Sequence, residues 1–568
     1  MRNLCLSDGC PKSCAMTKKT NFTEIFLIGC ITLTGLFYTY ISCLSSAVLC
    51  GYLIYKYVKR TTLRWYTNLS SIAILLLVAA YGLTAFGAID SGMAVIGFSK
   101  FLSVLLFAIV LMQQEENSEV FLRSIPYVAA AMTFLSAILM QISALKDIFS
   151  VAGRLAGFFG YPNTFALFLL FALIITVTKD SLCKADIIII PILLFGIVYS
   201  GSRTVFVLTA VTVLSLIILL KNKKLKIGVI SIVIAAVLGA IIYAALTNNV
   251  SAIGRFLTIS LKESTFIGRL LYFQDALPII LRHPFGLGYM GYYYIQTSIQ
   301  TGVYSVQYIH NDFLQMFLDI GWIPTAVFVA ALLKAFFKKG TTYRKRLLIF
   351  VLCAHCCFDF DLQFVAIFML LVTIMDIKSG NDIELKISKP LYISVVTVLA
   401  VACVYIGCAQ AFSRFGNVAV SSKMYPWNTQ NDIVAITSVS SPEEMNEIAD
   451  RILARNKYVT VAYSAKARYA YSKGDFANVI KYKKKAIDTA VFSYDEYEDF
   501  CYLLINGIYL YEKHGDDYSA NVCRKELVTT IKELQKNTER LSKLGRMIDD
   551  QPKTQLPDEI LRYAENLK

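Results

Sequence analysis

Long apolar segments recur along the first 412 residues of the chain and constrain its fold more than any other feature. A helix that crosses a membrane needs about 20 mostly apolar residues. With 56% hydrophobic residues, the chain is too apolar for a soluble protein. We therefore expect an all-α fold, a polytopic membrane helical bundle. Segments of suitable length lie near residues 23–39, 41–58, 68–88, 92–112, 123–143, 157–178, 185–200, 203–220, 227–246, 313–336 and 391–412.

Two further features of the apolar pattern predict helical hairpins. The run 23–58 is too long for one helix and has basic residues at both ends, Lys18-Lys19 and Lys56 to Arg60. The run 346–376 is interrupted by Asp359-Phe360-Asp361 and also has basic residues on both sides. A hairpin whose acidic tip faces outward explains the second run. With both hairpins, the region 23–412 is expected to contain about 11 to 13 spans.

The basic residues predict the orientation of these spans. We expect residues 1–22 to be cytoplasmic, because the positive-inside rule then holds for every strongly basic short loop. Counting the spans from a cytoplasmic N-terminus places the large loop 247–312 and everything after residue 412 on the outer face. A single helix over 23–58 would invert these sides. The basic loops are Lys221–Lys226, Lys338–Arg346 and Lys378–Lys389.

Residues 413–568 differ in composition and predict a soluble α-helical domain. Small residues at Ala467, Ala470 and Ala486, with a Gly474-Asp475 turn, are typical of one tetratricopeptide-type helix pair. A second copy near residues 509–527 is weaker, and an unrelated helical bundle explains the pattern equally well. Cys501 and Cys523 could form a disulfide outside the membrane, although the sequence does not require it.

Several functions are not supported by the sequence. The net charge of +15 is explained by topology, and no basic patch interleaved with aromatic residues indicates nucleic-acid binding. The chain has no P-loop, no Gly-rich dinucleotide fingerprint and no DxD-like pair in a nucleotide-binding fold. We therefore expect no cofactor, no metal and no nucleic-acid partner.

Three features on the expected outer side carry residues suited to chemistry. Arg203 lies in the turn Tyr199–Thr204, Arg269 begins an expected interfacial helix through Ile280, and His310-Asn311 precedes an apolar segment. A neutral histidine can act as a general base for a hydroxyl group. Two arginines can clamp a diphosphate and stabilise it as a leaving group.

Several polar residues of the chain, Arg203 among them, also have a simpler structural explanation. Arg203 could extend toward lipid headgroups, and Asn163 could cap a helix instead of binding substrate. His355 and Asp361 could form a buried pair or contact substrate. Lys100 is costly in lipid and should face protein or the outer cavity. The many tyrosines of the loop 247–312 suit sugar rings and a membrane interface equally well.

The residues discussed above lie in short motifs that follow one another along the chain. They are Gly160-Tyr161-Pro162-Asn163-Thr164, Ser200-Gly201-Ser202-Arg203-Thr204, Gly268-Arg269, His283-Pro284-Phe285-Gly286-Leu287-Gly288, His310-Asn311-Asp312-Phe313-Leu314 with Gly321, and His355 with Asp359-Phe360-Asp361. In this order, over residues 20–412, the chain resembles the O-antigen ligase and O-antigen polymerase superfamily of bacterial membrane glycosyltransferases.

The resemblance implies a metal-independent transferase at the outer face of the bacterial cytoplasmic membrane. Its donor would be undecaprenyl-diphosphate-linked glycan, and its acceptor a glycan or another surface molecule. His310 would be the base, Arg203 and Arg269 would bind the lipid diphosphate, and Asn311 and Asn163 would contact substrate. The C-terminal helical domain would dock a protein partner or present the acceptor. Whether the chain is a ligase or a polymerase stays open.

Two other functions are less consistent with the sequence than glycan transfer. In a flippase or transporter of lipid-linked saccharide, the arginines would line a path and His310 would relay protons; inverted repeats would favour it, and none is evident. A scaffold anchored in the membrane is less consistent with so many spans, because one span is enough for an anchor.

Overall fold

The computed structural model describes residues 21–219, 231, 234, 237–239, 241–248, 254 and 263–566. Most of the N-terminal segment 1–22 and nine residues of the span predicted at 227–246 lie outside these residues.

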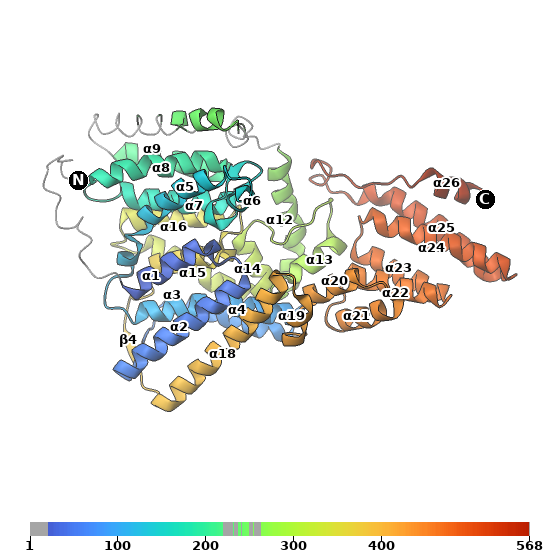
Figure 1. Cartoon of the computed structure of the whole chain (residues 1–568), viewed down its shortest axis with the longest axis horizontal. Coiled ribbons are helices and arrows are strands. Elements are labelled where there is room, and N and C mark those ends of the chain that lie inside the picture. The colour runs from blue at the N-terminus through green and yellow to red at the C-terminus, as the bar shows by residue number, and fades with distance from the viewer. Residues whose placement is uncertain are drawn as a thin grey trace.

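The first part of the chain forms a helical bundle (Figure 1). The run 23–58 is a hairpin, as predicted, because α1 ends at Thr32 and α2 begins at Thr39. The elements up to residue 219 are α1 Phe22–Thr32, η2 Thr34–Leu36, α2 Thr39–Arg60, β1 Leu63–Tyr66, α3 Leu69–Leu83, η3 Thr84–Phe86, α4 Ser91–Met112, η4 Ser118–Leu122, α5 Ile125–Leu139, α6 Lys146–Phe149, β2 Ser150–Val151, β3 Arg154–Leu155, η5 Gly157–Phe159, α7 Pro162–Val177, α8 Lys184–Ser200 and α9 Arg203–Leu219.

The second part of the bundle contains the predicted interfacial helix as α12 and the predicted second hairpin as α16 and α17. Its elements are α12 Ser264–Arg282, α13 Gly291–Ile299, α14 Asp312–Ile320, α15 Trp322–Phe337, α16 Tyr343–Cys356, η6 Asp361–Gln363, α17 Val365–Ile374, β4 Asp382–Leu385 and α18 Lys389–Arg414.

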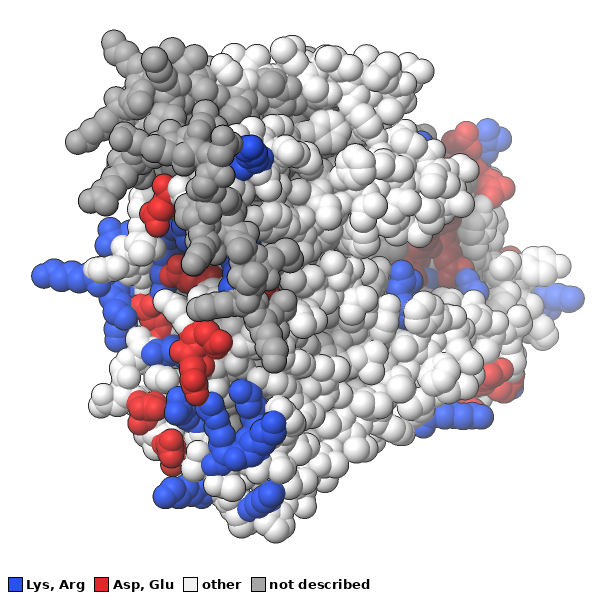
Figure 2. Space-filling model, turned by 60° about the vertical axis from the view of Figure 1, so that its left-hand side comes forward, with Lys and Arg blue, Asp and Glu red and all other residues white. Residues whose placement is uncertain are grey.

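The bundle has the composition of a membrane protein. Within the described residues, five helices are long and apolar enough to cross a membrane: Thr39–Arg60, Leu69–Phe86, Ser91–Met112, Ser118–Leu139 and Lys389–Arg414. Figure 2 shows a broad surface without charged side chains between two charged margins. An all-α polytopic membrane fold, as the sequence predicted, agrees with both observations. Lys100 in α4 is 1% exposed and donates to Gln363 at 3.3 Å, so it faces protein and not lipid.

Two of the three basic loops that the sequence singled out, Lys338–Arg346 and Lys378–Lys389, lie together at one end of the bundle. The third, Lys221–Lys226, lies outside the described residues. Strand β1 pairs with β4 in antiparallel register, which joins the end of α2 to the segment before α18. Lys378 donates to the carbonyl groups of Gln114 and Glu116, and Lys338 and Lys345 both pair with Asp376. The loops after α2, α4, α15 and α17 therefore share this end.

One predicted span is broken, and the prediction of a single helix over 313–336 is wrong. Gly321 has φ +84° and separates α14 from α15. A Cβ atom at Gly321 would lie 2.3 Å from the Pro284 carbonyl oxygen, so only glycine fits there. The amide of Trp322 donates to the same oxygen at 2.9 Å. The turn after α12 is thereby fixed against the end of α14.

All the regular elements in the described part of the C-terminal region are helices, and residues 541–557 form turns and irregular structure. It consists of α19 Val418–Met424, α20 Thr429–Ser438, α21 Pro442–Arg455, α22 Thr460–Ser472, α23 Phe476–Thr489, α24 Tyr494–Lys513, α25 Asp517–Gln535, η7 Lys536–Arg540 and α26 Asp558–Glu565. Helices α22 and α23 form the predicted pair around Gly474-Asp475. Their assignment to a tetratricopeptide repeat stays a prediction. Cys501 and Cys523 are buried free thiols.

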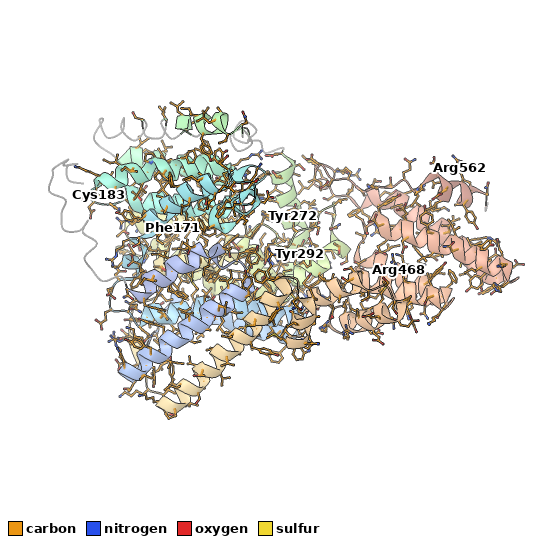
Figure 3. The ribbon with its side chains drawn as sticks, viewed as in Figure 1. Phe171, Cys183, Tyr272, Tyr292, Arg468 and Arg562 are labelled. Carbon is orange, nitrogen blue, oxygen red and sulfur yellow. The ribbon has the colours of Figure 1, made fainter. Side chains whose placement is uncertain are left out.

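This region packs on the end of the bundle opposite the basic loops. Asn456 donates to Asp90, the N-cap of α4, at 3.1 Å. Thr297 in α13 donates to the Thr489 carbonyl at 2.7 Å and accepts, through its own carbonyl, the amide of Val491 at 3.0 Å. Figure 3 shows Tyr272 and Tyr292, from α12 and α13, between the bundle and the C-terminal helices.

Candidate active site

A buried carboxylate lies at the centre of the polar cluster at this end of the bundle. Asp359, between α16 and η6, has a side chain that is only 1% exposed. Its Oδ1 lies 3.1 Å from His310 Nδ1 and accepts from the Tyr161 hydroxyl at 2.9 Å. Its Oδ2 accepts from Asn163 at 2.8 Å and from Arg269 at 3.4 Å. One carboxylate thus joins four residues from three separate parts of the chain.

The backbone around His310 is held in an unusual conformation. His310 has φ +54°, in the left-handed region that few residues other than glycine adopt. On one side, the Ile309 amide donates to Gln315 at 3.2 Å. On the other, Asn311 caps α14 by accepting from the Leu314 amide at 3.0 Å. The position of the imidazole is therefore fixed from both directions.

The partner of His310 determines which ring nitrogen carries the proton. An ionised carboxylate only accepts hydrogen bonds, so Nδ1 of His310 donates to Asp359 and Nε2 keeps a lone pair. The His310 side chain is 22% exposed, so the ring is accessible from the surface of the site. Phe360 packs against it edge-on, with ring centroids 5.0 Å apart. This arrangement is suited to general-base chemistry, because the carboxylate would stabilise the protonated imidazole.

The charge state of Asp359 follows from the same contacts. Burial raises the pKa of Asp359, but the hydrogen bond from His310 and the positive charge of Arg269 outweigh it. The pKa of Asp359 is therefore held well below its ordinary value, and the group stays ionised across the physiological range.

Arg154 also belongs to the cluster, although the sequence motifs did not identify it as a candidate. Its Nη2 donates to Asn163 Oδ1 at 2.6 Å, and its Nε donates to the Ser200 carbonyl at 2.7 Å. Ser200 ends α8, directly before the turn that leads to Arg203. The polar interval between the spans 123–143 and 157–178 lies on the same side as His310, which was the one indication available.

The two predicted arginines are both brought to the first half of α12. Arg203 forms an ion pair with Glu263, the N-cap of α12, and Arg269 lies in the second turn of that helix. Their side chains are 17% and 19% exposed. Two guanidinium groups that stay charged at any physiological pH are therefore placed beside one helix start.

The amides of the two predicted asparagines are both used inside the protein. Asn163 bridges Arg154 and Asp359, whereas Asn311 caps α14 and donates to the Cys357 carbonyl at 3.0 Å. Their contact with substrate stays a prediction. His355 and Asp361 form a buried pair, one of the two arrangements that the sequence allowed.

One group of side chains in the described residues has the geometry of a metal site. Ligand atoms of Asp312, Cys356 and Asp361 lie within 4.8 Å of one another, and all three residues are buried. Hydrogen bonds already use these carboxylates, because Asp312 accepts from the Leu362 amide at 2.9 Å and Asp361 pairs with His355. Internal hydrogen bonding is thus sufficient to explain the group.

The fold and the cluster together define a polytopic α-helical membrane protein with a carboxylate, histidine and arginine centre at one end. Residues 188–358 match the family model described as O-antigen ligase, Wzy_C. This match supports the O-antigen ligase and polymerase superfamily that the sequence motifs predicted, and it indicates a role in polysaccharide assembly. It includes Arg203, Arg269 and His310, and Asp359 is the next residue after its end. No curated protein and no solved structure matches the chain.

Proposed function

We propose that the protein transfers or polymerises undecaprenyl-diphosphate-linked glycan at the outer face of the cytoplasmic membrane. The observation that carries this proposal is the pairing of His310 with the buried carboxylate of Asp359, beside Arg269. It supports the proposal because a histidine can accept a proton and an arginine can bind phosphate, and both contact the same carboxylate.

In the proposed reaction, His310 Nε2 takes the proton of an acceptor hydroxyl. The hydroxyl oxygen attacks the anomeric carbon of the donor, and the bond between that carbon and the phosphate oxygen breaks. The lipid diphosphate leaves with the negative charge. Asp359 stabilises the imidazolium, and the guanidinium groups stabilise the leaving diphosphate.

The role of Arg203 requires a change of partner. Glu263 pairs with Arg203 in this structure, so a diphosphate would compete with that carboxylate for the guanidinium. A diphosphate carries more negative charge and accepts bidentate hydrogen bonds, which favours the exchange. Metal independence is part of the proposal, since two arginines can neutralise this leaving group.

The first test is made in cells of the bacterium that makes this protein. We expect His310→Ala to abolish polymer or conjugate while the amounts of protein and lipid-linked precursor are maintained. Normal amounts of surface glycan in this strain would overturn the general-base role.

Arginine substitutions test the diphosphate clamp separately. Arg269→Lys and Arg203→Lys keep the charge but lose the planar fork, so glycan production should fall by about tenfold or more. Arg282→Lys is the matched control, because Arg282 is exposed at the far end of the same α12 helix. Full activity of both site variants would remove support for the clamp.

A further inference from the structure

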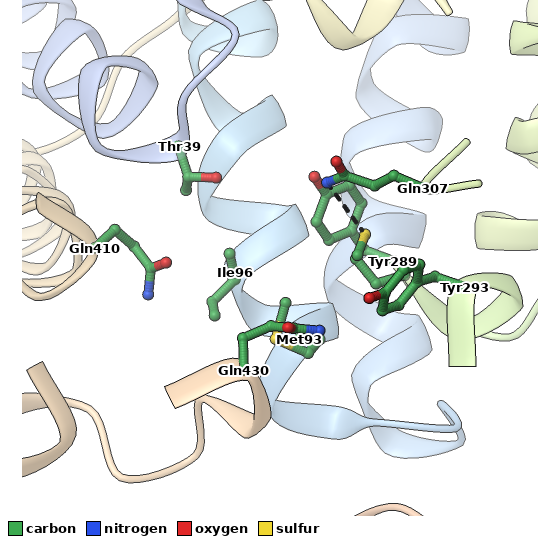
Figure 4. Close-up of a pocket in the computed structure, with 9 residues that line it drawn as sticks. Thr39, Met93, Ile96, Tyr289, Tyr293, Gln307, Gln410 and Gln430 are labelled. Atoms are coloured by element: carbon green, nitrogen blue, oxygen red, sulfur yellow. Dashed lines mark hydrogen bonds between the residues drawn. The ribbon is translucent and has the colours of Figure 1, made fainter. Parts of the chain in front are cut away.

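A cavity of about 290 Å³ lies between the bundle and the C-terminal region. It is formed by the start of α2, the first turns of α4, the segment before α13, the end of α18 and the start of α20 (Figure 4). Its lining residues are Thr39, Met93, Ile96, Tyr289, Met290, Tyr293, Gln307, Gln410 and Gln430. This volume is near the lower end of ligand pockets, which span about 300–1,000 Å³.

The lining has the chemistry of a saccharide site. Three glutamine amides provide donors and acceptors, and two tyrosine rings provide apolar faces for the C–H groups of a sugar. None of the described residues that line the cavity is ionised, which disfavours an anionic ligand. The Gln410 Nε2 atom is buried and has no hydrogen-bond partner in the described part of the chain. An unpaired buried donor is costly, and a ligand hydroxyl would satisfy it.

Three aromatic side chains in succession, Tyr289, Tyr308 and Phe360, connect the cavity wall to His310. Tyr289 and Gln307, from its wall, hydrogen-bond to the Tyr308 hydroxyl at 2.8 and 3.2 Å. The Tyr308 ring contacts Phe360 with centroids 5.4 Å apart, and Phe360 in turn contacts His310. A ligand in the cavity would therefore be separated from His310 by these side chains and would not occupy the reacting centre.

The C-terminal region completes one wall of this cavity. Gln430, in the first turn of α20, donates to the Tyr294 hydroxyl at 2.9 Å. Tyr294 belongs to α13, so this bond holds the wall against the segment that leads to His310. The cavity thus depends on contacts between the two parts of the chain.

From these observations we propose that the cavity binds one neutral sugar residue of the acceptor glycan, at a distance from the residue whose hydroxyl reaches His310. This inference rests on the proposed function, and it gives the C-terminal region a part in acceptor binding. Gln410 and Thr39 would bind sugar hydroxyls, and Tyr289 and Tyr293 would pack against the ring.

The test measures saccharide binding by the purified full-length protein. The probes are the oligosaccharide repeat released by mild acid from the strain's lipid-linked precursor, and fragments of its mature surface glycan. We expect the wild type to bind at least one of them, and Gln410→Leu and Thr39→Val to bind about tenfold more weakly. Gln535→Leu, on the exposed face of α25, is the matched control and should bind as the wild type does.

Two further arms separate this inference from the proposed function. His310→Ala should keep binding, because the cavity does not include His310, even though it makes no polymer. Saturating lipid-linked donor should leave the binding intact, whereas competition would show that the cavity holds a donor sugar and would overturn the inference. Wild-type affinity in both cavity variants, or no binding of either probe by the wild type, would also overturn it. None of these results depends on whether His310 is the base.

Discussion

Asp359 is the residue on which the candidate site depends, because its two oxygen atoms hold His310, Arg269, Tyr161 and Asn163. Its ionised form is favoured by the contacts that outweigh burial. Replacing it with asparagine would keep the shape of the side chain but remove the charge that fixes the His310 tautomer.

This carboxylate should make the stability of the protein depend on pH. The pKa of Asp359 is lowered in the folded state relative to about 3.9 in an unfolded chain. Its contribution to stability is therefore present above about pH 5 and is lost as the pH falls toward the folded-state pKa. We expect the Tm advantage of the wild type over Asp359→Asn, measured in detergent, to shrink between about pH 6 and pH 3.

The control for this measurement is Asp382→Asn, an exposed aspartate on β4 at the opposite end of the bundle. The Tm of Asp382→Asn should differ little from that of the wild type at any pH. A Tm difference between the wild type and Asp359→Asn that increases as the pH falls would contradict the direction of the pKa shift.

Single residues were predictable to different degrees. His310, Arg203 and Arg269 were found because charged or titratable groups next to apolar segments are conspicuous. The role of Asp359 was not, since its contacts to α7, α12 and the segment before α14 arise only in the folded bundle. Arg154 was missed because the short strands β2 and β3 have too few residues to show a periodic pattern.

At the level of elements, the break between α14 and α15 positions His310. The amide of Leu287 donates to the Leu318 carbonyl at 2.6 Å, and that of Gly288 donates to the Asp319 carbonyl at 3.0 Å. These bonds attach the turn after α12 to the last turn of α14. The helix that begins just after His310 and the helix that carries Arg269 are therefore fixed to each other.

The glycine at this break provides a direct test. Gly321→Ala would bring a Cβ atom within 2.7 Å of the Phe285 carbonyl carbon, so we expect a loss of more than about 2 kcal/mol of stability. Thermal unfolding in detergent and the amount of protein in the membrane would measure it. Gly340→Ala is the control, because Gly340 also has a positive φ of 83° but no neighbouring atom within 4 Å. It should cost only about 1 kcal/mol. Equal effects of the two substitutions would show that the close approach is unimportant.

Helices were easier to predict than breaks. Apolar runs in a membrane must satisfy their backbone hydrogen bonds internally, so their length alone indicates helices. The apolar composition continues across Gly321, and a single glycine in such a run does not distinguish a break from a continuous span.

For the molecule as a whole, the charged loops and the site lie at opposite ends of the bundle. The described basic loops lie near the β1 and β4 pair, while His310, Asp359 and the C-terminal helices lie at the other end. By the positive-inside rule, we propose that the site and the C-terminal region lie outside the cytoplasm.

A reporter that is active only outside the cytoplasm tests this orientation. Alkaline phosphatase fused after Lys568 should be active, and the same enzyme inserted at Gly340, in a basic loop, should be inactive. Immunoblots of both fusions control for their amounts. The reverse pattern would place the site on the cytoplasmic side and would contradict the proposed use of an outer-face donor.

The central claim is that His310, held by Asp359, deprotonates the acceptor. The most direct measurement is single-turnover glycan transfer by the purified protein from lipid-linked donor, with donor binding measured in parallel. We expect His310→Ala and Asp359→Asn each to slow transfer by about 10²- to 10⁴-fold, with donor binding changed far less. Transfer at the wild-type rate by His310→Ala would contradict the account.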